Sequence, residues 1–444
     1  MIPSILVHQL RKGISDFIRT TFPVSTPYFH GIVDRLMNGE GNVFKGPYLS
    51  IQLPFRTGTQ DENYFPDVPM KFAPYLHQEL AFVRLGGVNP KSTIISTGTG
   101  SGKTESFLFP ILNYCNQHKG EPGIKAILIY PMRALATDQA NRIAQIIYDN
   151  PNLKGHITAG LYIGQKEEVP QMVMSRDGII TNKETMRLTP PDILLTDYKM
   201  LDYLLIRAKD YPLWKDSGPE TLRYLVIDEL HTFEGAQGTD LACLLRRLKV
   251  RLSIPERHLC CIGTSATLGD KQEQTKQLSF AGEIFGETFD RDAIIIEHRL
   301  SAREFLEKSL ISRIELVPTE KATELRPESY DSYSSFVQAQ YRLWFGENLP
   351  DDSFTQETWR VKLGEQLKEL LFFQNLLKVL SGQIKSYEEV IEETVRVTPG
   401  VERTDNQYVT DLLNSLLTLV SLALIDNDGK TSPFLQVRYQ FWMR

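Results

Sequence analysis

Cysteine is scarce in this sequence, and its four cysteines form no CxxC pair. A disulfide framework and a self-contained four-cysteine zinc site are therefore not expected. Cys260 and Cys261 stand side by side in an apolar run that is typical of a buried strand, and we expect them to pack in a core. This cysteine usage fits the reducing environment of the cytoplasm.

Excess positive charge and long apolar runs are also absent. The formal net charge is −6, so any contact with nucleic acid must be local rather than driven by a general basic field. The longest apolar run, LLNSLLTLVSLALI from Leu412, is about four residues too short to cross a bilayer. The first 22 residues lack the apolar centre and the cleavage site of a signal peptide. We therefore expect a soluble cytoplasmic protein without membrane contact.

The sequence pattern divides the chain into three zones. Residues 1–70 combine an amphipathic helix with an irregular segment rich in Pro, Gly and aromatic residues. Residues 71–300 alternate short apolar runs with helical patterns, which predicts an α/β fold with a parallel sheet and crossover helices. The predicted strands are TIIST, AILIY, AGLYI, DILLT, YLVID and CCIGTSA.

Residues 301–444 predict a mainly helical zone. Its last helix has an apolar stripe from Val409 to Val420, as expected for a helix with one buried face. The zone also contains aromatic residues that we expect in a core rather than on a base-stacking platform: Tyr341, Trp344, Phe345 and Trp359.

A glycine-rich segment, TGTGSGKT, lies between the strand TIIST and a helical pattern. Glycines let the backbone turn so that its N–H groups face a phosphate, and the next helix presents its N-terminus to the same anion. Lys103 would neutralise phosphate oxygens and Thr104 would bind Mg²⁺. The alternative is a plain glycine turn. The predicted nucleotide-binding residues are Thr97, Gly98, Thr99, Gly100, Ser101, Gly102, Lys103 and Thr104, of which Thr97 departs from the usual glycine.

Two adjacent acids, Asp228 and Glu229, follow a later strand in the segment VIDELHTFEGAQG. Open α/β sheets bind ligands at the carboxyl ends of their strands, so these acids are expected beside the glycine-rich loop. Asp228 can hold Mg²⁺ there through water, and Glu229 can orient and deprotonate an attacking water. The alternative is a pair of solvated acids at a strand end.

These segments resemble the DEAD/DEAH (DExH) box helicases of superfamily 2, and the resemblance continues in order over about 200 residues. YLHQ is similar to the adenine-reading element, which implies that Gln78 contacts adenine and that Phe72 or Tyr75 stacks on it. YPMRALATDQ resembles motif Ia, and GLYIG and PPDILLTDYKMLDYLLIR resemble the next two strand contacts. His231 completes the DExH box, and motif III is matched by Ser265, Ala266 and Thr267.

The resemblance implies a RecA-like helicase lobe one at residues 71–300 that uses ATP and Mg²⁺. Asp228, Glu229 and His231 would be its catalytic residues, and motif III would couple the nucleotide state to the grip on a strand. TGTGSGKTESFLFPIL and DELHTFEGAQGTDLACLLRRL are most similar to the MrfA-type DNA-repair helicases and to the large helicases of the Druantia and DISARM anti-phage systems.

Helicases of this type hold a strand mainly by its phosphates, which gives affinity without sequence preference. Arg133 and Thr196 lie on loops at strand ends and are the predicted DNA contacts; for Arg133 the alternative is a surface ion pair. Arg133 and Asp197 stand where relatives commonly carry asparagine, and we expect Asp197 to cap the following helix. The basic run RRLKVRLSIPERH is expected to line a solvated helix face, with a DNA track as the alternative.

A second RecA-like lobe is not recognisable in the sequence. The 177 residues after Thr267 contain no Gly-Arg dipeptide and nothing like Q-x-x-G-R-x-x-R, the motif that carries an arginine finger. We therefore expect residues 301–444 to be an insertion between lobes, and a second lobe in the same or another chain. The chain alone is expected to be nearly inactive.

The sequence thus predicts the N-terminal motor portion of an ATP-dependent helicase or translocase, which acts on single-stranded or duplex DNA in anti-phage defence or repair. Proteins of a defence complex would be its partners. One alternative is a non-catalytic ATP-binding scaffold that clamps a partner protein, although a clamp has no need for the base Glu229. Another is an RNA helicase, because phosphate contacts discriminate weakly unless 2′-hydroxyls are touched.

Overall fold

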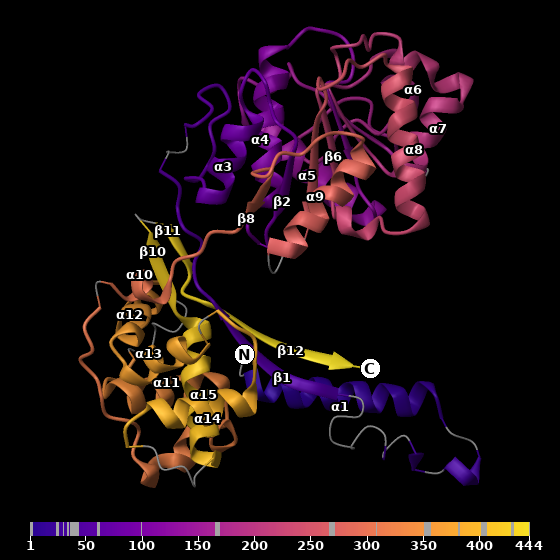
Figure 1. Ribbon diagram of the computed structural model, residues 1–444. Helices are drawn as coiled ribbons and strands as arrows, with labels where there is room; N and C mark the ends of the chain where they lie inside the picture. Colours follow the sequence, from indigo (N-terminus) through magenta and orange to yellow (C-terminus); the bar gives the residue numbers. More distant parts are fainter. Residues whose placement is uncertain are drawn as a thin grey trace. The chain divides into compact units, whose positions relative to one another are not determined.

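The computed structural model describes residues 3–23, 26–29, 31–32, 35, 44–59, 63–98, 100–164, 169–265, 271–307, 309–349, 357–380, 382–400, 406–427 and 430–443. The chain forms two compact units. Unit 1 comprises Met1–Pro54 and Arg299–Arg444, and unit 2 comprises Phe55–His298. The elements of both units are labelled in Figure 1.

Unit 2 contains a seven-stranded parallel sheet with the strand order β4-β5-β3-β6-β7-β2-β8. In chain order the strands are β2 (Thr93–Ser96), β3 (Ala126–Ile129), β4 (Ala159–Tyr162), β5 (Ile193–Thr196), β6 (Tyr224–Ile227), β7 (Cys260–Ser265) and β8 (Ile294–Ile296). All six predicted strands are confirmed. The edge strand β8 was not predicted, because three isoleucines are shorter than the usual strand pattern.

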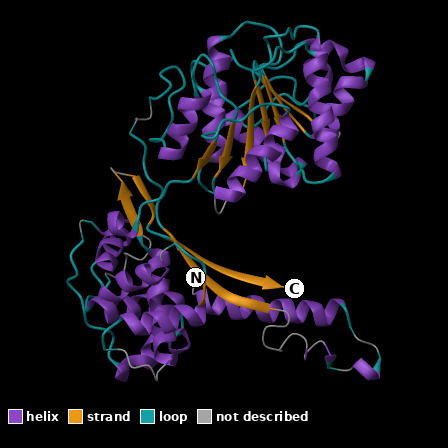
Figure 2. Ribbon diagram, in the orientation of Figure 1, coloured by secondary structure: helices purple, strands orange, loops and turns teal. Residues whose placement is uncertain are grey.

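Helices cover both faces of this sheet (Figure 2). Strand side chains alternate between the faces, so Ile95 and Leu128 lie in one buried cluster, whereas Ile94 and Ile127 lie in another. The first cluster includes residues of α3 (Leu76–Leu85), α4 (Lys103–Gln117) and α5 (Arg133–Asp149). The second includes residues of α6 (Lys183–Leu188), α7 (Tyr198–Ile206), η2 (Ala208–Trp214), η3 (Leu230–Thr232), α8 (Ala236–Arg251) and α9 (Lys271–Phe285). This is the predicted RecA-like α/β fold.

Unit 1 is mainly helical and carries two small antiparallel sheets, with the strand orders β12-β1-β9 and β10-β11. Its helices are α1 (Pro3–Thr21), η1 (Pro27–Phe29), α10 (Ala302–Leu306), η4 (Thr319–Leu325), η5 (Pro327–Ser329), α11 (Tyr333–Phe345), α12 (Glu357–Lys368), α13 (Leu371–Leu380), α14 (Tyr387–Val397) and α15 (Asn406–Leu422). Its strands are β1 (Phe44–Gln52), β9 (Lys385–Ser386), β10 (Leu424–Asn427), β11 (Lys430–Pro433) and β12 (Gln436–Met443).

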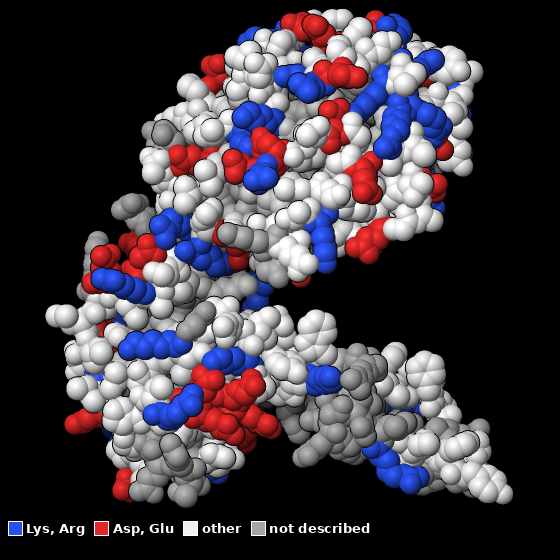
Figure 3. All heavy atoms as spheres, in the orientation of Figure 1, with Lys and Arg blue, Asp and Glu red and all other residues white. Residues whose placement is uncertain are grey.

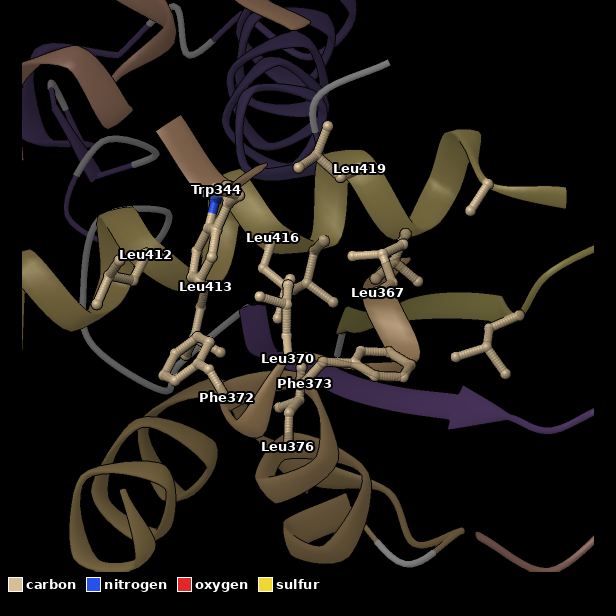
Figure 4. Packing of buried hydrophobic residues seen from close by; sticks show 14 of the residues in the cluster. Trp344, Leu367, Leu370, Phe372, Phe373, Leu376, Leu412, Leu413, Leu416 and Leu419 are labelled. Atoms are coloured by element: carbon tan, nitrogen blue, oxygen red, sulfur yellow. The ribbon is translucent and has the colours of Figure 1, made fainter. Parts of the chain in front are cut away.

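The core of unit 1 is built on α15. The leucines of its predicted stripe are buried, and Figure 4 shows Leu413 and Leu416 beside Trp344 of α11 and Phe372 of α13. Figure 4 draws part of one continuous buried cluster. The expectation that the zone's aromatic residues pack in a core is confirmed, since all four are at least nine-tenths buried: Tyr341, Trp344, Phe345 and Trp359.

The units divide the chain differently from the three predicted zones. Residues 1–54 share a unit with residues 299–444, because β1 pairs with β12 along its length, with Leu49 opposite Tyr439. Residues 55–70 belong to unit 2, where Phe65 and Val68 are buried in the cluster under α3 and α4. A hydrophobic pattern does not reveal such a pairing, since the two strands lie at opposite ends of the chain.

Cys260 and Cys261 are buried in β7 as expected, and Cys243 is exposed on α8. Among the described residues, none of the helices combines the length and apolarity that a bilayer crossing requires.

Candidate functional site

The glycine-rich loop joins β2 to α4 at the carboxyl edge of the sheet. Gly100 and Gly102 have φ values of 78° and 77°, in the left-handed region where glycine is favoured. A Cβ atom on Gly102 would also lie 2.3 Å from Nε2 of Gln78. The loop therefore needs glycine at position 102 for its backbone conformation, and a Cβ atom there would displace the Gln78 amide.

Thr97, the departure from the usual pattern, has a structural role. Its side chain is buried, and its Oγ1 lies 2.7 Å from Oγ of Ser101 across the loop. His77 reaches the same turn, with Nε2 at 2.8 Å from the carbonyl oxygen of Ser101. The hydroxyl pair explains how the loop closes with threonine in place of glycine.

Gln78 links the start of α3 to the loop. Its Oε1 accepts the backbone N–H of Tyr75 at 2.9 Å, and its Nε2 donates to the carbonyl of Gly102 at 3.2 Å. The Tyr75 ring lies 5.0 Å from the ring of Phe55, and Phe72 packs on Phe109. The structure thus shows Gln78 supporting the loop, and its contact with adenine stays a prediction.

Lys103, the first residue of α4, brings the loop and the acids together. Its Nζ donates to Oε1 of Glu229 and to the carbonyl oxygen of Ser265, each at 3.2 Å. The lysine side chain is 14% exposed, and Thr104 follows it in the first turn of the helix. A cation, a helix N-terminus and two acids therefore meet at one point, as a nucleotide phosphate would require.

The acids Asp228 and Glu229 are held by Thr264 of β7. The Thr264 hydroxyl donates to Oδ1 of Asp228 at 2.5 Å and accepts the backbone N–H of Glu229 at 3.0 Å. Glu229 has φ 50° and ψ 51°, a left-handed conformation that costs a residue with a side chain about 1–3 kcal/mol. Burial raises the pKa of Asp228, the hydrogen bond from Thr264 opposes this shift, and the charge of Glu229 adds to it.

His231 lies between Glu229 and motif III. Its Nδ1 is 3.4 Å from Oε2 of Glu229 and 3.3 Å from Oγ of Ser265. The structure thereby brings together the predicted catalytic residues and the first residue of the predicted coupling motif. Three predicted residues lie outside the described part of the chain: Thr99, Ala266 and Thr267.

The predicted strand contacts lie at the same edge, where Arg133 begins α5 and Thr196 ends β5. Arg133 Nε is 3.8 Å from Oδ2 of Asp197, and its side chain is 59% exposed. Asp197 caps α7 as predicted, with its carboxylate accepting the Met200 N–H at 2.8 Å. Thr196 is buried, and its hydroxyl donates to the carbonyl of Tyr162 at 2.7 Å. Contact of Arg133 or Thr196 with a strand stays a prediction.

Sequence reasoning missed two residues at the site. Thr264 precedes motif III by one position. A hydroxyl side chain directly before Ser265 was the signal in the sequence that could have indicated a role at the site. Glu297 follows β8 and accepts the backbone N–H of Gly98 at 2.9 Å. Its partner lies in the loop, far away in the sequence, so no local signal could reveal it.

The residues fit a nucleotide with Mg²⁺. The described residues contain no group of three or more His, Cys, Asp and Glu side chains that could enclose a metal by themselves. Mg²⁺ in phosphate sites commonly uses one or two protein oxygens and completes its shell with phosphates and waters. Thr104 and Asp228 are the candidate ligands, and they lie beside the loop and Lys103, which would hold the phosphates.

Comparison with known proteins identifies one segment of the chain. Residues 75–275 match the family model described as DEAD/DEAH box helicase. The Druantia protein DruE of Escherichia coli (strain UMEA 4076-1) is 28% identical over 52% of this chain and 18% of DruE. The uncharacterized ATP-dependent helicase YprA of Bacillus subtilis (strain 168) is 31% identical over 46% of this chain and 24% of YprA. This chain thus covers a quarter or less of either relative.

Among solved structures, the DUF1998 helicase MrfA bound to DNA and AMPPNP is similar, with a TM-score of 0.41 and 20% identity over 75% of this chain and 47% of that chain. The sequence match spans the segment that carries the glycine-rich loop, the DExH acids and Ser265. The segment of residues 75–275 is thus a DEAD/DEAH box helicase segment.

Proposed function

We propose that this chain is the first motor lobe of an ATP-dependent DNA helicase or translocase. The observation that carries the proposal is the meeting of Lys103, Asp228 and Glu229 at the carboxyl edge of the sheet, beside a glycine-rich loop. A site that only clamps nucleotide has no need for a second acid held in a left-handed backbone conformation. The paired acids therefore favour hydrolysis over the scaffold alternative.

Each residue has a distinct part in this proposal. The loop amides and Lys103 bind the β- and γ-phosphates, and Thr104 with Asp228 holds Mg²⁺, which neutralises phosphate charge when bound. Glu229 orients the attacking water and takes its proton. In this proposal His231 transmits the nucleotide state to motif III, and its contacts with Glu229 and Ser265 support that role.

The proposed substrate is single-stranded or duplex DNA, and a second RecA-like lobe in the same or another chain is the proposed partner. Within the described residues there is one parallel sheet, and it supplies half of the groove in a two-lobed motor. DNA rather than RNA follows from the resemblance of the motif sequences to DNA-repair and anti-phage helicases. The proposed role is anti-phage defence or DNA repair, which the similarity to DruE supports.

Phosphate release by a protein that contains this chain and a second lobe tests the proposal. We expect single-stranded DNA to stimulate release more than RNA of equal length. No stimulation by either strand would refute the motor function, and equal or greater stimulation by RNA would refute the choice of DNA. A Lys103→Ala variant is the matched control, because it should lose nucleotide binding and with it all stimulated release.

A further inference from the structure

The hydroxyl of Tyr130 is a buried donor. Charged side chains of both signs are spread over the visible surface of unit 2 (Figure 3), where water can solvate them. Tyr130 lies beneath this surface and is 1% exposed, and its hydroxyl has no hydrogen-bond partner among the described residues. A buried hydroxyl that makes no hydrogen bond destabilises the fold, and natural proteins keep such groups mainly at functional sites.

Tyr130 stands next to Asp228 at the carboxyl edge of the sheet. β3 and β6 pair in parallel, with Ile129 opposite Ile227. The N–H of Asp228 donates to the carbonyl of Ile129 at 2.9 Å, so the pairing continues beyond both strands. Tyr130 and Asp228, which directly follow the two isoleucines, are therefore opposite each other.

The two side chains lie on the same face of the sheet. Side chains alternate between the faces along a strand, and Tyr130 belongs to the buried cluster that contains Leu128 and Val226. These residues stand two positions before Tyr130 and Asp228. The cluster also includes residues of α4, whose second residue is Thr104. The Tyr130 side chain is thus on the same side of the sheet as the two proposed metal ligands.

The charge of Asp228 acts on the Tyr130 hydroxyl. Burial raises the pKa of Tyr130, and the charge of Asp228 raises it further, so the hydroxyl keeps its proton and can donate it to a hydrogen bond. Oδ1 of Asp228 accepts from Thr264, and a carboxylate can accept several hydrogen bonds through its two oxygens. Neighbouring strands lie about 4.8 Å apart, so a rotation of the Asp228 side chain would bring its carboxylate to the Tyr130 hydroxyl.

We propose that Tyr130 positions Asp228 in the nucleotide site. When a nucleotide and Mg²⁺ are bound, the Tyr130 hydroxyl donates a hydrogen bond to the Asp228 carboxylate, in addition to the bond from Thr264. Carboxylates that hold metals are commonly hydrogen-bonded in this way, which fixes their orientation. The inference rests on the proposed function, because it requires Asp228 to be a ligand of the nucleotide's Mg²⁺.

Isothermal titration calorimetry of the full 444-residue chain with AMPPNP, in Mg²⁺ and in EDTA, tests this inference. The test variant is Tyr130→Phe, which removes the hydroxyl and keeps the ring. The matched control is Tyr224→Phe. Tyr224 is also 1% exposed and lies in the same buried cluster, but its hydroxyl donates to the carbonyl of Leu85 at 2.7 Å.

The two variants should differ from the wild type in opposite ways. Tyr130→Phe should bind AMPPNP with Mg²⁺ about 10- to 100-fold more weakly, the usual loss when the hydrogen-bond partner of a metal ligand is removed. In EDTA its affinity should equal that of the wild type. Its melting temperature without nucleotide should not fall, because the change removes a buried hydroxyl that has no partner. Tyr224→Phe should bind AMPPNP like the wild type and melt at a lower temperature, because it loses a formed hydrogen bond.

Four results would overturn the inference. If the wild type binds AMPPNP with Mg²⁺ and Tyr130→Phe binds it as tightly, the hydroxyl does not position Asp228, and the proposed function stands. If Tyr130→Phe loses the same factor in EDTA, its hydroxyl serves the loop or the nucleotide instead of the metal ligand. If Tyr130→Phe melts as low as Tyr224→Phe, the hydroxyl has a structural partner in the fold. If the wild type does not bind AMPPNP with Mg²⁺, the proposed function fails together with the inference.

Discussion

The hydroxyl of Thr264 donates a 2.5 Å hydrogen bond to the carboxylate of Asp228. The same oxygen accepts the N–H of Glu229, so a single side chain in β7 orients the proposed metal ligand and holds the backbone of the proposed base. The two acids stand next to each other in the sequence, but their geometry is set from another strand of the sheet.

Replacing Thr264 by valine should impair Mg²⁺-dependent nucleotide binding. Valine has the same shape but leaves the Glu229 N–H without its acceptor, which costs about 1–3 kcal/mol for a buried donor. We expect affinity for AMPPNP with Mg²⁺ to fall by roughly tenfold, with little change when Mg²⁺ is removed by EDTA. Isothermal titration calorimetry measures both values. Thr264→Ser keeps the hydroxyl and serves as the control. If the valine variant binds AMPPNP with Mg²⁺ as tightly as the serine variant, the Thr264 hydroxyl does not organise the site.

Glu229→Gln should retain ATP affinity and lose turnover. The amide oxygen can still accept a hydrogen bond from Lys103, which lies 3.2 Å from Oε1, but it cannot take a proton from water. Phosphate release should be measured in a protein that also contains a second lobe, alongside a direct nucleotide titration. Turnover near that of the wild type would remove Glu229 from the role of base.

Gln78→Ala should weaken binding of ATP more than binding of UTP. Gln78 donates to the carbonyl of Gly102, so some loss is expected for any nucleotide through the loop. An adenine contact would add a further loss for ATP alone. Competition of both nucleotides against a fluorescent analogue measures the difference; equal losses would show that Gln78 acts only through the loop.

Leu416→Ala should destabilise unit 1 and spare the nucleotide site. Leu416 is fully buried in the cluster shown in Figure 4, and removing a buried leucine costs about 2–5 kcal/mol. Trp344 and Trp359 are buried in unit 1, whereas Trp214 is buried in unit 2, so tryptophan fluorescence during urea unfolding reports on unit 1 when Trp214 is replaced by phenylalanine in all proteins compared. The AMPPNP affinity should match that of the wild type, and a parallel loss would show that the two units do not fold independently.

The isolated 444-residue chain should hydrolyse ATP at least about a thousandfold more slowly than a two-lobed protein that contains it, because an arginine finger is worth roughly 10³ to 10⁵ in rate. Turnover assays of both proteins, with and without DNA, test this expectation. A match between them would locate a catalytic arginine within residues 270–444.

The sequence revealed the features whose signal is local. The strands of unit 2 are continuous apolar runs because both faces of the sheet are covered, and the cap at Asp197 needs a partner only three residues away. By contrast, the acceptors and donors around the site come from distant segments. Thr264 is 36 positions from Asp228, and Glu297 is 199 positions from Gly98. The hydroxyl of Thr264 beside motif III is visible in the sequence, but its partners are not, because these contacts exist only once the sheet has assembled.

The pairing of β1 with β12 has a consequence for synthesis on the ribosome. β1 ends at Gln52 and β12 begins at Gln436, so roughly 380 residues are translated between the two partners. At about 5–20 residues per second, β1 waits roughly 20–80 s for this neighbour. Unit 2 is contiguous in the sequence and can be complete by then. The other neighbour of β1, β9, is also translated late, at Lys385–Ser386. Both edges of β1 therefore lack their partner strands for most of the interval, which leaves the first strand of the nascent chain open to mispairing.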